Sequence, residues 1–72
     1  KYDLAVEQLL TAKNEAKIMN ESKKEIIYEL ASVYEKMGKP DLAFAEYKEI
    51  YTVDASYKDV SAKVDYYYSN KK

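Results

Sequence analysis

Residues 24–57 read KEIIYELASVYEKMGKPDLAFAEYKEIYTVDASY, and this stretch decides the fold. Apolar residues recur in it at spacings of three and four, first as Ile27, Leu30, Ala31 and Tyr34 and then as Ala43, Tyr47 and Ile50. This period predicts two amphipathic helices, over residues 20–37 and 40–53. Between them Gly38 can adopt the left-handed conformation that ends a helix, and Pro40 fits the first turn of the next one. The stretch therefore predicts a helical hairpin with a tight turn.

The two flanks of this stretch also predict helices. Upstream, apolar residues repeat at helical spacing over residues 2–17, within a segment that covers residues 1–19. Downstream, residues 56–70 predict a fourth helix with one apolar stripe: Tyr57, Val60, Val64 and Tyr67. Strand-like alternation is not sustained, and short connectors between helices of this length favour antiparallel neighbours. The chain is therefore predicted to be all-α, with four short antiparallel helices in a single domain over residues 1–72.

Capping residues predict where two of these helices begin. Ser22 is followed three residues later by Glu25, which is the spacing of a reciprocal capping box. Ser56 is followed at the same distance by Asp59 and can cap the fourth helix in the same way. Both serines are therefore predicted to stand at helix starts.

The composition excludes several classes of partner. With 12 basic and 13 acidic residues the net charge is −1, so no positive field is available for nucleic acid. Every basic residue is a lysine, and without the rigid fork of arginine a dedicated phosphate site is not expected. No apolar run approaches the roughly 18 residues of a membrane span, so no membrane partner is expected. Cysteine is absent, which excludes disulfides, and a cytoplasmic location is the default expectation.

Catalytic chemistry is not expected. The chain lacks His and Cys, the side chains that most often serve as base or nucleophile near neutral pH. Two glutamate pairs share a helix face and are interpreted as surface charges that partner lysines: Glu25 with Glu29, and Glu46 with Glu49. Carboxylates without His, Cys or a glycine-containing loop do not build a defined metal site. The chain is therefore predicted to be no enzyme and to carry no metal or cofactor.

Tyrosine is unusually frequent, with nine residues. Four of them lie on apolar stripes and are predicted to fill the core with large rigid rings: Tyr34, Tyr47, Tyr57 and Tyr67. Tyr66 points away from the stripe of the last helix, so it is either a contact residue for a partner or a solvated side chain. Base stacking by residues 66–68 is not favoured, because successive helical residues point about 100° apart and no basic groove accompanies them.

The order of large, small, aromatic and glycine positions in residues 24–57 resembles one complete tetratricopeptide repeat. The matching positions are Leu30, Ala31, Tyr34, Gly38, Ala43, Tyr47, Val53 and Asp54. Residues 1–19 look like the second helix of a preceding repeat, and residues 56–70 look like the helix that closes such arrays. Ile50 stands where the family usually has a small residue and is expected to alter the curvature. Because the chain opens at Lys1 within a helical pattern, it is interpreted as a segment of a longer superhelix.

This resemblance implies a protein-interaction scaffold, because the family commonly binds partners along a groove formed by the first helix of each repeat. The corresponding positions are Glu25, Tyr28, Ser32, Glu35 and Lys36. Tyr28 between acidic neighbours suits a basic and apolar peptide or helix. Tyr28 and Ser32 stand where family members that clamp a C-terminal carboxylate have Lys and Asn, which argues against a receptor of that kind. The alternative interpretation is an exposed helix face without a ligand.

Self-association is the second functional hypothesis. A half repeat at one end exposes an apolar face that its missing helix would cover, which favours pairing with another copy. The residues proposed for this contact are Leu9 and Leu10 near one end of the chain and Tyr66 and Tyr68 near the other. A homo-oligomer whose mass is unaffected by substitution of the groove residues favours this hypothesis. A monomer that loses its partner on Tyr28→Ala favours the scaffold.

Overall fold

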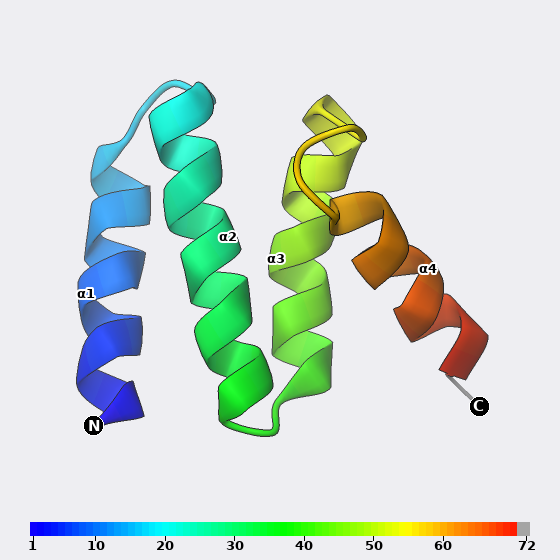
Figure 1. Cartoon of the computed structure of the whole chain (residues 1–72). Helices are drawn as coiled ribbons and strands as arrows, with labels where there is room; N and C mark the ends of the chain where they lie inside the picture. Colours follow the sequence, from blue (N-terminus) through cyan, green and yellow to red (C-terminus); the bar gives the residue numbers. More distant parts are fainter. Residues whose placement is uncertain (71–72) are drawn as a thin grey trace.

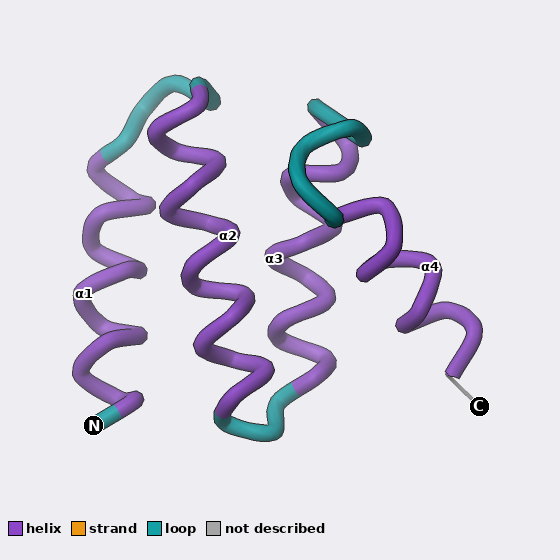
Figure 2. Tube along the Cα trace, viewed as in Figure 1, coloured by secondary structure: helices purple, strands orange, loops and turns teal. Residues whose placement is uncertain are grey.

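The computed structural model describes residues 1–70, and this part of the chain contains four α-helices and no strand (Figure 1). The helices are α1 (Tyr2–Glu15), α2 (Glu21–Lys36), α3 (Pro40–Val53) and α4 (Val60–Asn70). They run alternately in opposite directions, with connectors at alternating ends of the molecule (Figure 2). The all-α prediction is confirmed. Residues 71 and 72, which the predicted domain includes, lie outside the described residues.

The helices form a thin layer in which each packs against its neighbours in the chain. α1 contacts α2, α2 contacts α3, and α3 contacts α4. The Cα atoms extend over 33 × 28 × 15 Å, so the molecule is flattened along its shortest dimension. In Figure 1, α4 slants away from α3 toward the C terminus. A layer of this kind leaves both of its faces and both of its end helices exposed to solvent.

The core lies between α2 and α3. Nine apolar residues are buried: Ile27, Leu30, Ala31, Tyr34, Ala43, Tyr47, Ile50, Val60 and Val64. α2 contributes four of them and α1 contributes none, because α1 covers α2 only with half-buried side chains. Burial of one large aliphatic side chain stabilises the folded state by about 1.5–3 kcal/mol. The α2–α3 hairpin therefore supplies most of the packing energy of the layer.

The turn between α2 and α3 has the geometry that Gly38 and Pro40 predict. Gly38 has a φ of 74°, which is strained for any residue with a Cβ. The Lys39 amide donates to the Tyr34 carbonyl at 2.9 Å, and this bond satisfies a carbonyl that the helix end leaves open. Pro40 is the first residue of α3, where its missing amide costs nothing. The predicted tight turn is confirmed.

The predicted cap of α2 at Ser22 is wrong, because Asn20 caps this helix two residues earlier. Asn20 has an extended backbone, and its side-chain oxygen accepts the Lys23 amide at 3.0 Å. Asparagine caps helices at least as well as serine, so the earlier residue takes the position and Ser22 falls within the first turn. α1 also ends earlier than expected, at Glu15, since Ala16 has an extended ψ of 105°.

The predicted cap at Ser56 is also wrong, because α4 begins at Val60. The Ser56 hydroxyl donates to the Asp54 carboxylate at 3.0 Å and does not cap the helix. Lys58 has a φ of 41°, a left-handed conformation that keeps residues 56–59 out of the helix. Asp54 also accepts the Lys24 ammonium at 2.8 Å, and this bond, with the Ser56 bond, lowers the pKa of Asp54. The connector is therefore held as a compact turn.

Lysine side chains join helices that are not direct neighbours. The Lys13 ammonium of α1 lies 2.8 Å from the Glu46 carboxylate and 2.9 Å from that of Glu49, both on α3. Burial disfavours the charged form of Lys13, but its hydrogen bonds to the two glutamates outweigh this effect and raise its pKa. Lys63 of α4 likewise pairs with Glu35 of α2 at 3.1 Å. These pairs fix how α1 and α4 lie on the hairpin.

Candidate functional site

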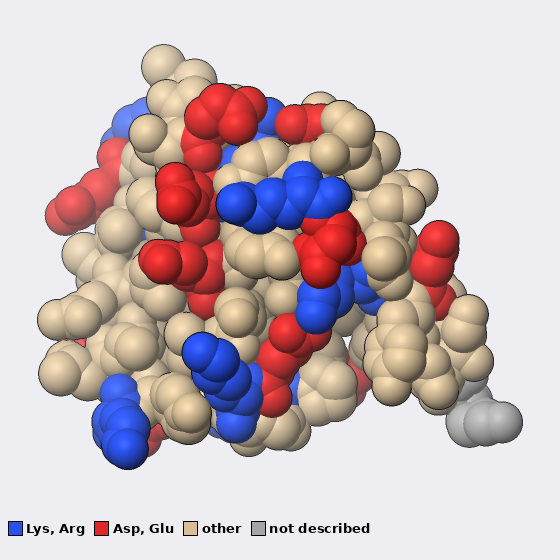
Figure 3. Space-filling view, viewed as in Figure 1, with Lys and Arg blue, Asp and Glu red and all other residues tan. Residues whose placement is uncertain are grey.

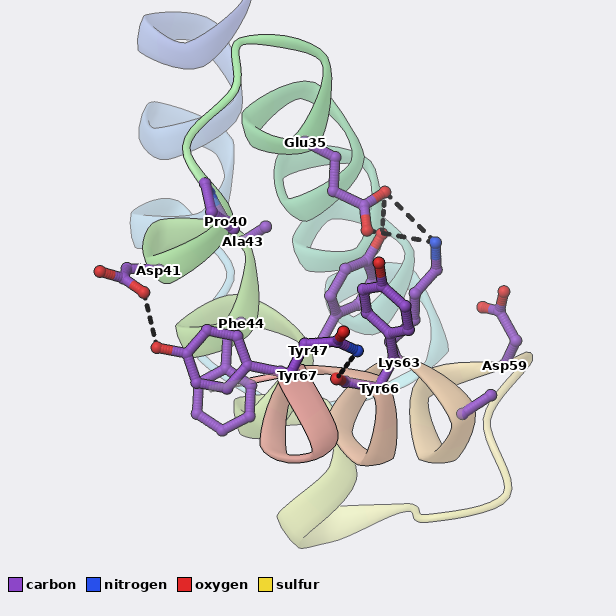
Figure 4. Close-up of a pocket in the computed structure, with 12 residues that line it drawn as sticks. Glu35, Pro40, Asp41, Ala43, Phe44, Tyr47, Asp59, Lys63, Tyr66 and Tyr67 are labelled. Carbon is purple, nitrogen blue, oxygen red and sulfur yellow. Dashed lines mark hydrogen bonds and ion pairs between the residues drawn. The ribbon is translucent and has the colours of Figure 1, made fainter. Parts of the chain in front are cut away.

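A pocket of about 750 Å³ lies where α4 slants away from α3 (Figure 4). From α3 it is lined by Pro40, Asp41, Ala43, Phe44 and Tyr47, and from α4 by Ala62, Lys63, Tyr66, Tyr67 and Asn70. Glu35 at the end of α2 and Asp59 just before α4 complete the lining. On each helix these residues are spaced by three and four, so each helix turns one face to the pocket.

Aromatic rings form one wall of the pocket. Phe44 and Tyr67 stack with centroids 3.9 Å apart and an interplanar angle of 15°. Tyr68 meets the Phe44 ring edge-on at 5.2 Å. The Tyr67 hydroxyl donates to the Asp41 carboxylate at 2.5 Å. The Tyr67 side chain is therefore held by ring stacking and by a hydrogen bond at its hydroxyl. The wall is a rigid apolar surface that belongs to both α3 and α4.

A polar cluster forms the opposite wall, where Tyr47, Glu35 and Lys63 converge (Figure 4). The buried Tyr47 hydroxyl donates to Glu35 at 3.1 Å, and the Lys63 ammonium donates to both oxygens of the same carboxylate at 3.1 and 3.3 Å. Lys63 also lies 5.5 Å from the centre of the Tyr47 ring. Burial, followed by the Glu35 charge, raises the pKa of Tyr47 well above its usual value of 10.0. The charge of Lys63 thus neutralises the charge of Glu35, and this ion pair joins α4 to α2.

Two further carboxylates, Asp41 and Asp59, carry negative charge at the rim. Each accepts one tyrosine hydroxyl, from Tyr67 and Tyr28 respectively. Among residues 1–70, no lysine ammonium lies within ion-pair distance of either carboxylate. Figure 4 places the two at opposite ends of the pocket. With Glu35 balanced by Lys63, the rim keeps a net negative charge at both ends.

The structure brings Tyr28 beside this pocket and fixes it there. Its ring meets those of Tyr47 and Tyr57 edge-on, with centroids 5.5 and 6.1 Å away. Its hydroxyl donates to Asp59 at 2.5 Å, and this bond, with partial burial, raises the pKa of Tyr28 to about 12. The Lys58 ammonium lies 5.5 Å from the ring centre. Tyr28 is therefore a half-buried support of the pocket and not a free anchor.

The other predicted groove residues differ in whether they line the pocket. Glu35 is exposed and lines the pocket, whereas Glu25, Ser32 and Lys36 do not belong to its lining. Ser32 is half-buried, and Glu25 and Lys36 are exposed. Figure 3 shows acidic and basic side chains interleaved over the middle of this face, where α2 lies. Only Glu35 and Tyr28 of the predicted set are thus associated with the pocket.

The residues predicted for self-association also differ in their surroundings. Leu9 and Leu10 are half-buried and pack against the core. Tyr66 and Tyr68 are 70% and 54% exposed, and Tyr66 lines the pocket. On α1 the largest exposed aliphatic side chain is Leu4, at 58%. The open apolar surface therefore lies more on Leu4 and the two tyrosines than on the leucine pair.

Tyr34 and Tyr47 are buried in the core as predicted, and Tyr57 is half-buried but packs against the core. The prediction is wrong for Tyr67, which is half-buried and stacks on Phe44 outside the core. Tyr57 falls in the turn before α4, and Tyr67 lies where α4 has moved away from α3. Among the pocket residues not predicted as site residues from the sequence are Asp41, Phe44, Asp59, Lys63 and Asn70. The spacing of Lys63 and Asn70 along one face of α4 was a usable signal, but the stacking of Phe44 on Tyr67 depends on the helix angle.

No protein-family model matches this sequence, and neither a curated protein nor a solved structure similar to it was found. Within residues 1–70, no group of three or more acidic side chains is arranged to hold a metal ion. None of the helices described has the length and apolar character required to cross a lipid bilayer.

Proposed function

We propose that this chain is a non-enzymatic protein-interaction module, built like a segment of a tetratricopeptide-repeat array, that binds a peptide or helix of a partner protein. The observation that carries this proposal is the pocket between α3 and α4, with its aromatic wall and acidic rim. A volume of about 750 Å³ is within the range of about 300–1,000 Å³ that is common for binding sites. The proposed site combines this pocket with the adjoining face of α2.

The pocket suits a protein segment because it is open at the surface. Tyr66, one of its lining residues, is 70% exposed, so the side chain that occupies the pocket can belong to a longer chain that passes over it. Aromatic residues in an apolar patch with a polar rim are typical of energetic centres of protein interfaces. The layer is thin, so the α2 and α4 faces are both accessible to one extended partner.

The charged groups of the pocket favour recognition over catalysis. Glu35, Asp41 and Asp59 each accept hydrogen bonds from tyrosine hydroxyls, and Lys63 is paired with Glu35. These bonds hold the three carboxylates in fixed positions. The chain contains no His or Cys that could act as base or nucleophile. A rigid set of mutually bonded groups is the arrangement that a binding surface needs.

The test is selection of peptides by the chain. Random peptides displayed on phage are selected on the immobilised chain, and a helical protein of similar size and charge serves as the control surface. The proposal expects peptides that bind the chain and not the control, with NMR shift changes centred on α2, α3 and α4. If no peptide is enriched over the control, or if the shift changes fall on α1 alone, the proposed function is wrong.

Self-association is retained as the second candidate because large apolar side chains are exposed at both ends of the layer. These are Leu4 on α1 and Tyr66 and Tyr68 on α4. Light scattering on a sizing column over a wide concentration range separates the two candidates. A concentration-dependent oligomer that Leu4→Ser dissociates favours self-association, and a monomer at every concentration favours the interaction module.

A further inference from the structure

We propose, on the basis of the proposed function, that the pocket recognises a partner segment with an apolar or aromatic side chain flanked on both sides by lysine or arginine. This goes beyond the interaction module as a class, because it states the chemistry of the partner. Two features of the pocket carry the inference: the distribution of charge around its rim and the aromatic wall between the charges.

The negative charge of the rim favours a partner with cationic side chains. The pocket is lined by three carboxylates and one ammonium group, and Lys63 is already paired with Glu35. Asp41 and Asp59 are therefore the unbalanced charges, and a carboxylate can accept more bonds than the single tyrosine hydroxyl that each receives. A cationic side chain of a partner can pair with each of them without displacing a bond of the fold.

The position of these charges requires two cations and not one. Asp41 begins the α3 side of the pocket and Asp59 precedes α4, and Figure 4 shows them at opposite ends. An apolar partner with one cation would leave one carboxylate without a counter-charge. An acidic partner would meet repulsion at both ends, because Lys63 is the only cation that residues 1–70 contribute to the lining.

One wall of the space between the two carboxylates is apolar, and the Glu35–Lys63 pair belongs to the other. The stacked rings of Phe44 and Tyr67 and the small side chain of Ala62 are among the groups that line this space. An aliphatic or aromatic side chain placed there removes these rings from water, and a neighbouring cation gains further attraction from the ring faces. The combined pattern is therefore cation, apolar group, cation.

The experiment measures binding of the enriched displayed peptides to the chain and to charge variants, by fluorescence polarisation of the labelled peptides. Asp41→Asn and Asp59→Asn keep an oxygen that can accept the tyrosine hydroxyl, so the fold is preserved while the charge is removed. The matched controls are Asp3→Asn, which removes the same charge from the first turn of α1, and Asp65→Asn, which does so on α4 outside the pocket. Circular dichroism checks the fold of each variant.

The inference expects enriched peptides with Lys or Arg on both sides of an apolar residue. The double variant of Asp41 and Asp59 should bind them about tenfold more weakly, as two partly exposed ion pairs are lost, and the controls should bind them unchanged. Acidic peptides, or peptides whose affinity is equal for the double variant and the controls, overturn this inference but leave the interaction module intact. Failure to enrich any peptide overturns both. A dimer that dissociates on Asp41→Asn assigns the pocket to a second copy and also overturns the inference.

Discussion

The two interfaces of α3 differ in a way that separates stability from recognition. Against α2, α3 closes a core to which α2 alone contributes four buried residues. Against α4, which contributes only Val60 and Val64 to the core, the helices diverge and leave the pocket. The first interface is closed around buried side chains, and the second is open and is lined by the stacked rings of Phe44 and Tyr67. One helix thus serves as a wall of the core on one side and as a wall of the candidate site on the other.

The largest effect is expected from a cavity in the α2–α3 interface. Leu30 is fully buried, so Leu30→Ala should lower the free energy of unfolding by about 2–5 kcal/mol. Urea denaturation followed by circular dichroism measures this loss. Leu42 on α3 is 45% exposed, and Leu42→Ala should change stability by less than about 0.5 kcal/mol. Equal losses in the two variants would mean that the core is not where the structure places it.

A smaller and more local effect is expected at the α3–α4 interface. Val60 is fully buried, and Val60→Ala removes two methyl groups, which should cost about 1.5 kcal/mol. Because the backbone of α4 packs against α3, and the Lys63–Glu35 pair that joins α4 to α2 is partly exposed, amide hydrogen exchange should accelerate in α4 before it does in α2. Val53→Ala, at a position 57% exposed, is the control. Equal acceleration of amide exchange in all four helices would show that the α2–α3 and α3–α4 interfaces open together.

Tyr47 joins the two interfaces, so removal of its hydroxyl tests whether they are coupled. Tyr47→Phe keeps the buried ring but loses the bond to Glu35, which should cost about 1 kcal/mol. The peptides selected in the binding experiment should also bind this variant more weakly, because Glu35 and Lys63 lose a fixed partner. Thermal unfolding provides the first measurement. Tyr51→Phe, on the exposed face of α3, should leave stability and binding unchanged.

The smallest change in stability near neutral pH is expected from substitution of Tyr28, whose contribution to stability is lost in alkali. In the folded state the pKa of Tyr28 is raised from 10.0 to about 12, chiefly by its hydrogen bond to Asp59. A raised pKa stabilises the folded state fully below pH 10.0, and this contribution is lost as the pH rises through about 12. Tyr28→Phe should cost about 0.5 kcal/mol near neutral pH.

The same variant should show a shallower loss of stability between pH 10.0 and about 12 than the parent chain. Urea denaturation at a series of alkaline pH values gives this slope, and tyrosinate absorbance follows the titration directly. Tyr66→Phe is the control, because that side chain is 70% exposed. An unchanged slope for Tyr28→Phe would contradict the bond between Tyr28 and Asp59.

The hairpin could be predicted from the sequence because its signals are local. The spacing of Ile27, Leu30 and Tyr34 determines the buried face of α2, and Gly38 with Pro40 determines the turn. The cap of α2 was predicted at Ser22 and not at Asn20 because both residues are competent caps. Only the path of the connector decides between them.

The pocket could not be predicted in the same way, because it depends on the direction in which α4 leaves α3. That direction follows from the turn after Asp54, where Lys58 takes a left-handed conformation that a residue with a side chain rarely adopts. The sequence identified Glu35 and Tyr28 as residues near a site. It did not identify Phe44 and Tyr67 as one wall, since their contact joins positions far apart in the chain.

The order of the helices in the layer also has a consequence for how quickly the chain folds. Each helix contacts the helix that precedes it or follows it, so almost every backbone contact is made between segments that are close in sequence. Low contact order lowers the entropy lost on loop closure, and helical proteins of this kind fold in microseconds to milliseconds. During synthesis, α2 and α3 can pair as soon as both have left the ribosome, before α4 has left it.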